Sequence, residues 1–402
     1  NLGGVVGYAS ASVIATDVNA VAMNLQVASA VNGMGTIAGY LTGEASAFDK
    51  CSVDVANLTA TTKENNNIGG FVGYVDSAAS FANAYVTNAK VNAKANGNNV
   101  GGFIGCVGNE NATTSMTSCL VQKTTISGKT WVGEVIGKNA STNASVAAVY
   151  YYDVTTSHAD DAEIYTCEGI AEASSEAIAS GELAWNLNTV NGTVANSMVW
   201  SQGNGPRFAT DAAKATVRVA FTQPSGTTYC YTNGNGFVTV PSEVDINCEW
   251  PKDAYFLEDT VVNAIPYETT FQTQIDALYQ EYFVNNDCAG KGGTLLLGHS
   301  HFDPWFWPTW EAQTGLTKYV NGYNVGIGGT KTTDWFCAYD TLVKPFNADR
   351  FVISLGENDI NVGNSEGADV VTRLEKLFKQ IHKDHPDAEI YYVYSLPAAT
   401  KY

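Results

Sequence analysis

The stretch NIGGFVGYV, residues 67–75, decides the fold of the first third of the chain, because related strings return at a nearly fixed interval. The copies align Gly7, Gly39, Gly73, Gly105 and Gly137, at steps of 32, 34, 32 and 32 residues. Such a period is the signature of stacked repeats. Runs of Val, Ile, Thr and Tyr between Gly and Asn are typical of strands, and helical spacing is missing. We therefore predict a β-solenoid over residues 1–155, with one coil per repeat.

A second column of residues follows each aligned glycine by about ten positions and has the pattern apolar-x-x-small-x-apolar. We expect these side chains to stack from coil to coil in a buried ladder, with paired glycines at tight corners or close backbone approaches. Cys51 and Cys119 share the column of Ala84, so we interpret them as buried ladder residues and not as reactive thiols. The column consists of Phe48, Cys51, Val53; Phe81, Ala84, Val86; Met116, Cys119, Val121; and Val146, Val149, Tyr151.

The I/V-G-G-F-V/I-G strings resemble the GLUG-motif repeats of bacterial surface proteins. The resemblance covers residues 1 to about 152. It implies a right- or left-handed β-solenoid on a secreted or cell-surface protein. It also allows an adhesin-like or structural role, in which the solenoid associates with itself.

Charge is distributed unevenly along the 402 residues, whose net charge is −19. Residues 1–150 contain 7 Lys+Arg and 8 Asp+Glu, whereas residues 151–402 contain 14 and 32. Because nucleic-acid binding depends on basic side chains that neutralise phosphate, we expect no nucleic-acid partner. No apolar run is long enough for a transmembrane segment. The eight cysteines include no C-x-x-C pair and leave the compartment open.

Three further segments follow the solenoid. Residues 156–212 contain AEASSEAIASGELAWNLN, residues 171–188, which has helical spacing with Ser and Glu available as caps. We expect one or two helices there to cover the open edge of the last coil. Residues 213–268 read as a small β module in which Cys230 and Cys248 either pair or stay free. Residues 269–402 alternate strand and helix patterns, which predicts a flavodoxin-like α/β domain.

Three strings in this last segment each follow a predicted strand. The strand at 294–297 ends in Gly298, His299 and Ser300; NVGIGG, residues 324–329, forms a glycine-rich loop; and RFVISLGENDIN places Asn358 after a strand at 351–355. A serine at the end of a parallel strand, beside backbone N–H groups that can meet an oxyanion, has the placement that nucleophilic catalysis requires.

In order and in strand-end placement these strings resemble the first three blocks of the SGNH (GDSL-like) hydrolases, over residues 290–396. The resemblance implies Ser300 as nucleophile, with its own N–H, the N–H of Gly329 and the side chain of Asn358 as oxyanion donors. It implies no cofactor and no metal, and an acyl ester, such as one on a carbohydrate, as substrate.

Two departures from the family pattern stand out. His299 occupies the usual Asp position, which supports the turn and leaves nucleophilic chemistry intact. The family's D-x-x-H block, which supplies the general base and its acid, has no counterpart before Tyr402. An active esterase therefore requires that block after Tyr402 in the native polypeptide, whereas a structural or adhesive protein whose hydrolase-like domain is inactive or incomplete does not. We expect His382 and His385, at a helix end, to face solvent, and His301 to have only Asp303 as a nearby carboxylate.

Two other readings of this region remain. LLLGHSHFD also resembles the H-x-H-x-D run of metallo-β-lactamase-type hydrolases, but Pro304 replaces that motif's next histidine. The aromatic side chains Trp305, Phe306, Trp307, Trp310 and Trp335 are either core residues or a platform for sugar stacking.

Overall fold

The computed structural model describes residues 1–61, 66–93, 97–158, 165, 167–190, 193–194, 198–211, 214–303 and 322–393. The chain divides into two compact units. The first consists of Asn1–Ala220, Tyr229–Thr239 and Ala254–Thr260, and the second of Phe221–Thr228, Val240–Asp253 and Val261–Tyr402. The domain limits expected near residues 155, 212 and 268 stay predictions.

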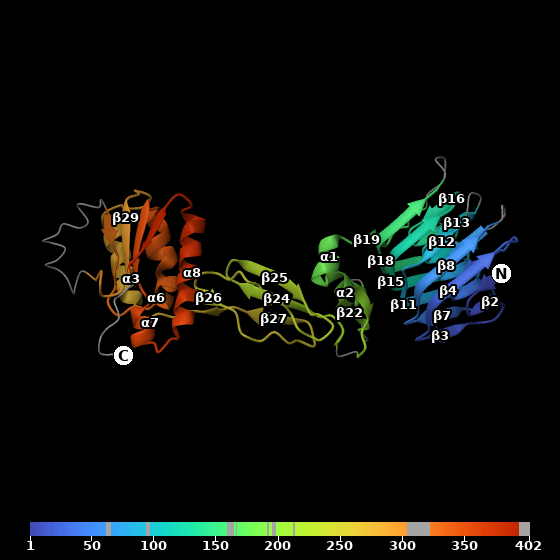
Figure 1. Cartoon of the computed structure of the whole chain (residues 1–402), viewed down its shortest axis with the longest axis horizontal. Coiled ribbons are helices and arrows are strands. Elements are labelled where there is room, and N and C mark those ends of the chain that lie inside the picture. Colours follow the sequence, from blue (N-terminus) through green and yellow to red (C-terminus); the bar gives the residue numbers. More distant parts are fainter. Residues whose placement is uncertain are drawn as a thin grey trace. The chain divides into compact units, whose positions relative to one another are not determined.

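The predicted β-solenoid is confirmed in the first unit, where three parallel sheets run along the repeat axis (Figure 1). Each coil contributes strands to all three. The first sheet contains β1 (Leu2–Gly3), β5 (Met34–Gly35), β9 (Asn66–Gly69), β13 (Asn98–Gly101) and β16 (Thr130–Gly133). The second contains β2 (Val6–Ala9), β6 (Ala38–Leu41), β10 (Val72–Val75), β14 (Ile104–Val107) and β17 (Ile136–Asn139). The third contains β3 (Ile14–Thr16), β4 (Asn19–Val27), β7 (Ser46–Asp49), β8 (Ser52–Ala60), β11 (Ala79–Thr87), β12 (Lys90–Asn92), β15 (Thr114–Ser127), β18 (Ser145–Ser157) and β19 (Ile170–Glu172).

The strand register confirms both predicted columns. Phe81 pairs with Phe48 on one side and Met116 on the other, and Ala84 pairs with Cys119. Cys51 and Cys119 are fully buried in the common core, as expected. The aligned glycines face each other because Val72 and Tyr74 flank Gly73 in register with their counterparts in the neighbouring coils.

The glycine column is required by close packing between the first two sheets. A Cβ atom on Gly73 would lie 2.2 Å from the backbone N of Met34 and 2.6 Å from the carbonyl O of Gly39. No side chain fits in that space. The sequence left two explanations for the paired glycines open, a tight corner or a close backbone approach. At Gly73 the glycine is required by the close approach of neighbouring backbone.

The apolar-x-x-small-x-apolar spacing has its cause in left-handed residues at fixed places in the third sheet. Asn83 has φ of +48° and Asn88 has φ of +52°, each between two inward-facing residues. An extra residue in a strand shifts the inward–outward alternation by one position, so spacings of three and two alternate. Equivalent residues recur in register: Asp17, Lys50, Asn83, Ser118 and Ala148 in one ladder, and Ala22, Val55, Asn88, Lys123 and Asp153 in the other.

Two short helices follow the solenoid, as predicted: α1 (Ser175–Ser180), capped by the Ser174 hydroxyl, and α2 (Glu182–Leu187). Ile170, directly before the helical stretch, lies in β19, which pairs with β18. The backbone edge of β18 is thus paired by β19 over Val149–Tyr151. Leu183 and Leu187 of α2 pack with Leu120, on the outward side of the third sheet. A buried outward column of apolar residues therefore decides where α2 lies.

Short strands complete this part of the chain. They are β20 (Thr189–Val190), β21 (Thr193–Val194), β22 (Trp200–Gly203), β23 (Gly205–Phe208), β24 (Arg218–Gln223), β25 (Gly226–Tyr231), β26 (Cys248–Glu249), β27 (Thr260–Asn263) and β28 (Ile265–Pro266). Strands β25, β24 and β27 form one sheet in that order. Cys230 and Cys248 are free thiols, like the other six cysteines.

The second unit has a four-stranded parallel sheet with the order β30-β29-β31-β32. Its strands are β29 (Thr294–Gly298), β30 (Gly322–Asn324), β31 (Arg350–Ser354) and β32 (Glu389–Tyr392). Its helical segments are α3 (Gln272–Tyr279), the π-helical η3 (Gln280–Asn285), α6 (Thr332–Ala338), the π-helical η4 (Tyr339–Val343), the 3-10 turn η5 (Lys344–Phe346), α7 (Glu357–Asn361) and α8 (Gly367–Asp384). The core holds Leu295, Leu297, Phe351 and Ile353 from the two central strands. An α/β arrangement with a parallel sheet was predicted here and is present.

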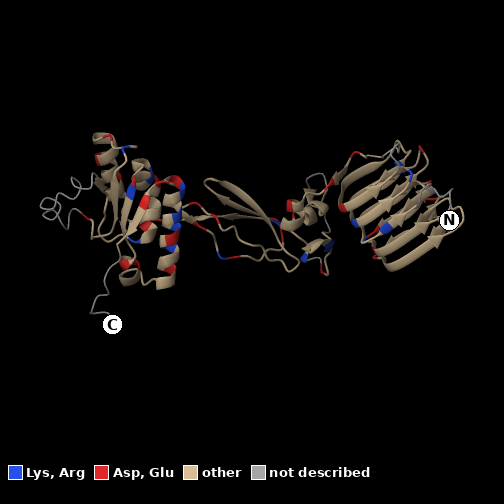
Figure 2. Ribbon diagram, turned by 45° about the horizontal axis from the view of Figure 1, so that its top comes forward, with Lys and Arg blue, Asp and Glu red and all other residues tan. Residues whose placement is uncertain are grey.

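The solenoid and the second unit differ in the density of charged residues. Figure 2 shows few charged residues on the solenoid strands and a dense, mixed set on α8. Within the residues described, no helix combines the length and the apolar character that crossing a membrane requires.

Candidate functional site

Ser300 lies in the turn that follows β29, half-buried at the carboxyl end of a central strand. The turn is fixed by backbone contacts with β31 and with the loop that follows β30. His299 N–H donates to the carbonyl O of Ser354 at 3.1 Å, and Ile327 N–H donates to the carbonyl O of Gly298 at 2.9 Å. A Cβ atom on Gly298 would lie 2.2 Å from that same Ser354 oxygen. The glycine before the H-S pair is therefore required by the approach of β31.

The glycine-rich loop after β30 packs directly on this turn. Gly328 N–H donates to Oδ2 of Asp303 at 2.6 Å, and a Cβ atom on Gly326 would lie 2.5 Å from the carbonyl C of Phe302. Gly329 has φ of +89°, a left-handed conformation that favours glycine. Asp303 thus binds the backbone of the glycine-rich loop.

Asn358 and Asp359 join the third strand end to the same loop. The side-chain Nδ2 of Asn358 donates to the carbonyl O of Thr330 at 3.0 Å. The buried carboxylate of Asp359 accepts the backbone N–H of Thr332 at 3.0 Å and its hydroxyl at 2.6 Å. Arg373 Nη1 lies 3.2 Å from Asp359 Oδ1.

The segments that carry Ser300, Gly329 and Asn358 therefore meet at one edge of the sheet. Strand β29 has β30 on one side and β31 on the other, so the connections that leave β29 and β30 run in opposite directions along the sheet. In open α/β sheets, ligands bind at the carboxyl ends of the strands where the order reverses in this way. The hydrogen bonds described above link the turn after β29 to the glycine loop and the loop to α7.

A histidine pair and a glutamate occupy the same edge. The ring centroids of His299 and His301 are 4.5 Å apart, His301 Nδ1 lies 3.1 Å from Ser354 Oγ, and His301 Nε2 lies 3.6 Å from Glu357 Oε2. Burial, and to a smaller extent the neighbouring His301, lowers the pKa of His299. The carboxylate that contacts His301 is that of Glu357, whereas Asp303, the carboxylate expected from the sequence, accepts the N–H of Gly328.

Sequence reasoning overlooked Glu357, Ser354 and Asp359 as site residues. The signal was present in SLGENDIN, residues 354–361, because every polar residue that follows a parallel strand lies at the same sheet edge. The motif comparison drew attention to Asn358 alone.

The remaining histidine and aromatic expectations have mixed outcomes. His382 is exposed, as expected, but His385 was wrongly placed in solvent, since it is 5 % exposed and packs 5.1 Å from the ring of Phe351. Trp335 is a core residue whose Nε1 donates to Thr330 Oγ1, so it offers no stacking platform. Trp305, Phe306, Trp307 and Trp310 lie outside the described residues.

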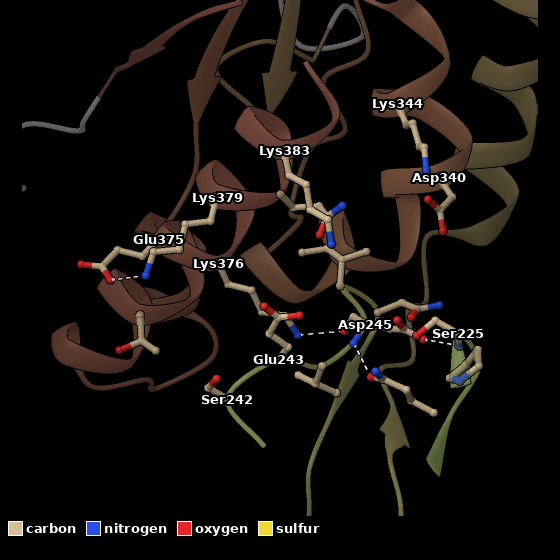
Figure 3. A pocket seen from close by; sticks show the side chains of 17 residues that line it. Ser225, Ser242, Glu243, Asp245, Asp340, Lys344, Glu375, Lys376, Lys379 and Lys383 are labelled. Carbon is tan, nitrogen blue, oxygen red and sulfur yellow. Dashed lines mark hydrogen bonds and ion pairs between the residues drawn. The ribbon is translucent and has the colours of Figure 1, made fainter. Parts of the chain in front are cut away.

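A large cavity of about 790 Å³ lies elsewhere in the second unit, along α8 (Figure 3). Two of its lysines, Lys376 and Lys379, contact neighbouring residues. Lys376 Nζ donates to the carbonyl O of Cys248 at 2.6 Å and of Asp245 at 3.1 Å, and burial lowers the pKa of Lys376. Lys379 pairs with Glu375 at 3.6 Å. Side chains of α8 and of residues 242–247 line this cavity, which shares no residue with the strand-end site.

Comparison with protein families matches residues 64–92 to the GLUG motif. Strand β11 of the third sheet lies in the second half of this segment. No curated protein matches the chain. The family match is confined to the solenoid and leaves the strand-end site to be judged on its geometry.

Proposed function

We propose that the second unit is an SGNH-type serine esterase, with Ser300 as nucleophile. The observation that carries this proposal is the set of hydrogen bonds that links three strand-end segments, Gly298 to Ile327, Asp303 to Gly328, and Asn358 to Thr330. A nucleophile, a glycine loop and an amide side chain on three neighbouring strand ends are parts that acyl transfer needs in addition to a general base.

The oxyanion of the tetrahedral intermediate would be met by the N–H groups of Ser300 and Gly329 and by the Asn358 amide. A primary amide has two N–H donors, and the bond of Asn358 Nδ2 to the Thr330 carbonyl orients the group. One well-placed donor of this kind stabilises the transition state by about 3–4 kcal/mol. The general base is not assigned to His301, because its ring nitrogens are directed to Ser354 and Glu357.

The substrate class is an acyl ester, for which an ester on a carbohydrate is the first choice. A secreted or cell-surface location is part of this proposal, and the support for it is the GLUG motif in the same chain. The solenoid would then present the esterase at the surface.

The proposal is tested with a fluorophosphonate probe, which forms a covalent adduct with activated serines, on the native polypeptide. We expect one adduct by intact mass, lost in Ser300→Ala and retained in Ser242→Ala, an exposed serine of the same unit. Asn358→Ala should slow adduct formation by about 100- to 1,000-fold. An adduct that survives in Ser300→Ala, or no adduct on the native polypeptide, would refute the esterase.

A second function, a structural or adhesive role for the solenoid, is favoured by the parallel sheets and the GLUG motif themselves. Stacked coils are a quasi-one-dimensional architecture that can associate with further copies. Sedimentation velocity of the native protein over a range of concentrations tests it. Self-association that is unchanged in Ser300→Ala supports this role, and a monomer at every concentration contradicts its self-associating form.

A further inference from the structure

We propose that His299, His301 and Glu357 form a binding site for one divalent transition-metal ion of the zinc class. The inference goes beyond the esterase and does not depend on it, because it rests on the three side chains alone. They come from the carboxyl ends of β29 and β31, the two central parallel strands of the second unit.

The distances suit a shared ion. One ligand atom of each side chain lies within 4.8 Å of the other two, and His301 Nε2 lies 3.6 Å from Glu357 Oε2. That separation is longer than an ordinary hydrogen bond. It is close to the roughly 3.3 Å that separates two ligand atoms around a tetrahedral zinc ion with bonds of about 2.05 Å. Small side-chain rotations would close the remaining distances.

His299 supplies an independent observation. It is 1 % exposed, and its Nε2 has no hydrogen-bond partner among the described residues. Its Nδ1 has only a long contact of 3.5 Å to the backbone N of His301. A buried polar atom without a partner costs about 1–3 kcal/mol, and a bound ion would remove that cost.

His301 also has the surroundings of a metal ligand. Its Nδ1 lies 3.1 Å from Ser354 Oγ, while its Nε2 faces Glu357. Histidines that ligate metals nearly always hold their second ring nitrogen in a hydrogen bond, which fixes the ring. Ser354, which is fully buried in β31, would be that fixed partner.

The donor set indicates the ion. Two imidazoles and one carboxylate suit zinc and its first-row neighbours, whereas Mg²⁺ and Ca²⁺ take oxygen ligands. Three protein ligands leave a fourth position open, as in catalytic rather than structural zinc sites.

The experiment is a titration of the full chain, without a histidine tag, with Zn²⁺ by calorimetry and with Co²⁺ by visible absorption. We expect one ion per chain and the intense d–d bands of four-coordinate Co²⁺. Because loss of an indirect partner already weakens binding by about 10- to 100-fold, His301→Ala and Glu357→Gln should each weaken it by more than about 100-fold. His382→Ala, which removes an exposed histidine of α8, should leave affinity unchanged.

His301 and Glu357 are partly exposed, with side chains 45 % and 33 % accessible, so substituting them should disturb the packing less than substituting buried His299. Circular dichroism of each variant checks this. The same titration in Ser300→Ala should give the same affinity, which separates this site from the esterase. Absence of binding below millimolar Zn²⁺, or binding that survives in both His301→Ala and Glu357→Gln, would overturn the proposal.

Discussion

Asp359 should be the main support of the strand-end site, and its substitution by Ala should destabilise the second unit by about 3–5 kcal/mol. The carboxylate is fully buried and accepts two hydrogen bonds from Thr332 at 3.0 and 2.6 Å and one from Arg373 at 3.2 Å. Removing this buried carboxylate costs about this much, because the buried N–H and hydroxyl of Thr332 lose their acceptor and Arg373, 31 % accessible, loses its ion pair. Asp359→Asn keeps the shape and loses the charge, so its cost should be smaller, about 1.5–3 kcal/mol.

Native-state hydrogen exchange read by mass spectrometry is the assay, because peptides from β29 and β31 report the opening of the second unit separately from the solenoid. Asp387→Asn, at an exposed position, is the control and should change the opening free energy by less than about 0.5 kcal/mol. If the β31 peptides of Asp359→Ala open within about 0.5 kcal/mol of the unsubstituted protein, the carboxylate does not hold α6 and α7 together and the reasoning fails.

Three further outcomes are expected. Phe81→Ala should destabilise the solenoid by about 3–5 kcal/mol, because the buried ring of Phe81 stacks on Phe48 with the ring centroids 5.3 Å apart. Urea unfolding followed by circular dichroism measures this change. The control Val5→Ala, at an exposed position, should change stability by less than about 0.5 kcal/mol. Gly298→Ala should cost about 1–3 kcal/mol or more in hydrogen exchange of β31, since the new Cβ would meet the Ser354 carbonyl oxygen, and an unchanged exchange rate would refute the contact. Burial lowers the pKa of His385, so between that lowered value and about pH 6.5 the unfolded chain binds a proton that the folded chain lacks. In this range the free energy of unfolding should fall as the pH decreases, by up to about 1.4 kcal/mol per pH unit. The variant His385→Gln should lose this part of the pH dependence.

Much of the solenoid was predictable because its interactions repeat. A glycine such as Gly73 and a ladder residue such as Ala84 each meet their own counterparts in adjacent coils, so one register explains all the coils. The position of α2 was not predictable in the same way. Its packing depends on Leu120, which faces outward from the third sheet, and a single sequence does not show which outward residues are covered.

In the second unit the sequence indicated the strands and the residues that follow them, because a short apolar run that ends in Gly and polar residues has few other interpretations. It did not indicate the partners of those residues. Asp303 was expected near His301 because they are neighbours in sequence, yet Asp303 binds the N–H of Gly328, and Glu357 from another strand end lies near His301.

The sequence by itself determined the repeat period, the ladder columns, the two central strands of the second unit, and the identity of the residues at the strand ends, since these follow from local spacing and side-chain type. Only the tertiary structure decided that His299, His301 and Glu357 converge, that Asp359 joins α7 to α6, and that His385 is buried. The physical reason is that strand order brings together residues more than 50 positions apart, and burial depends on what packs over a residue.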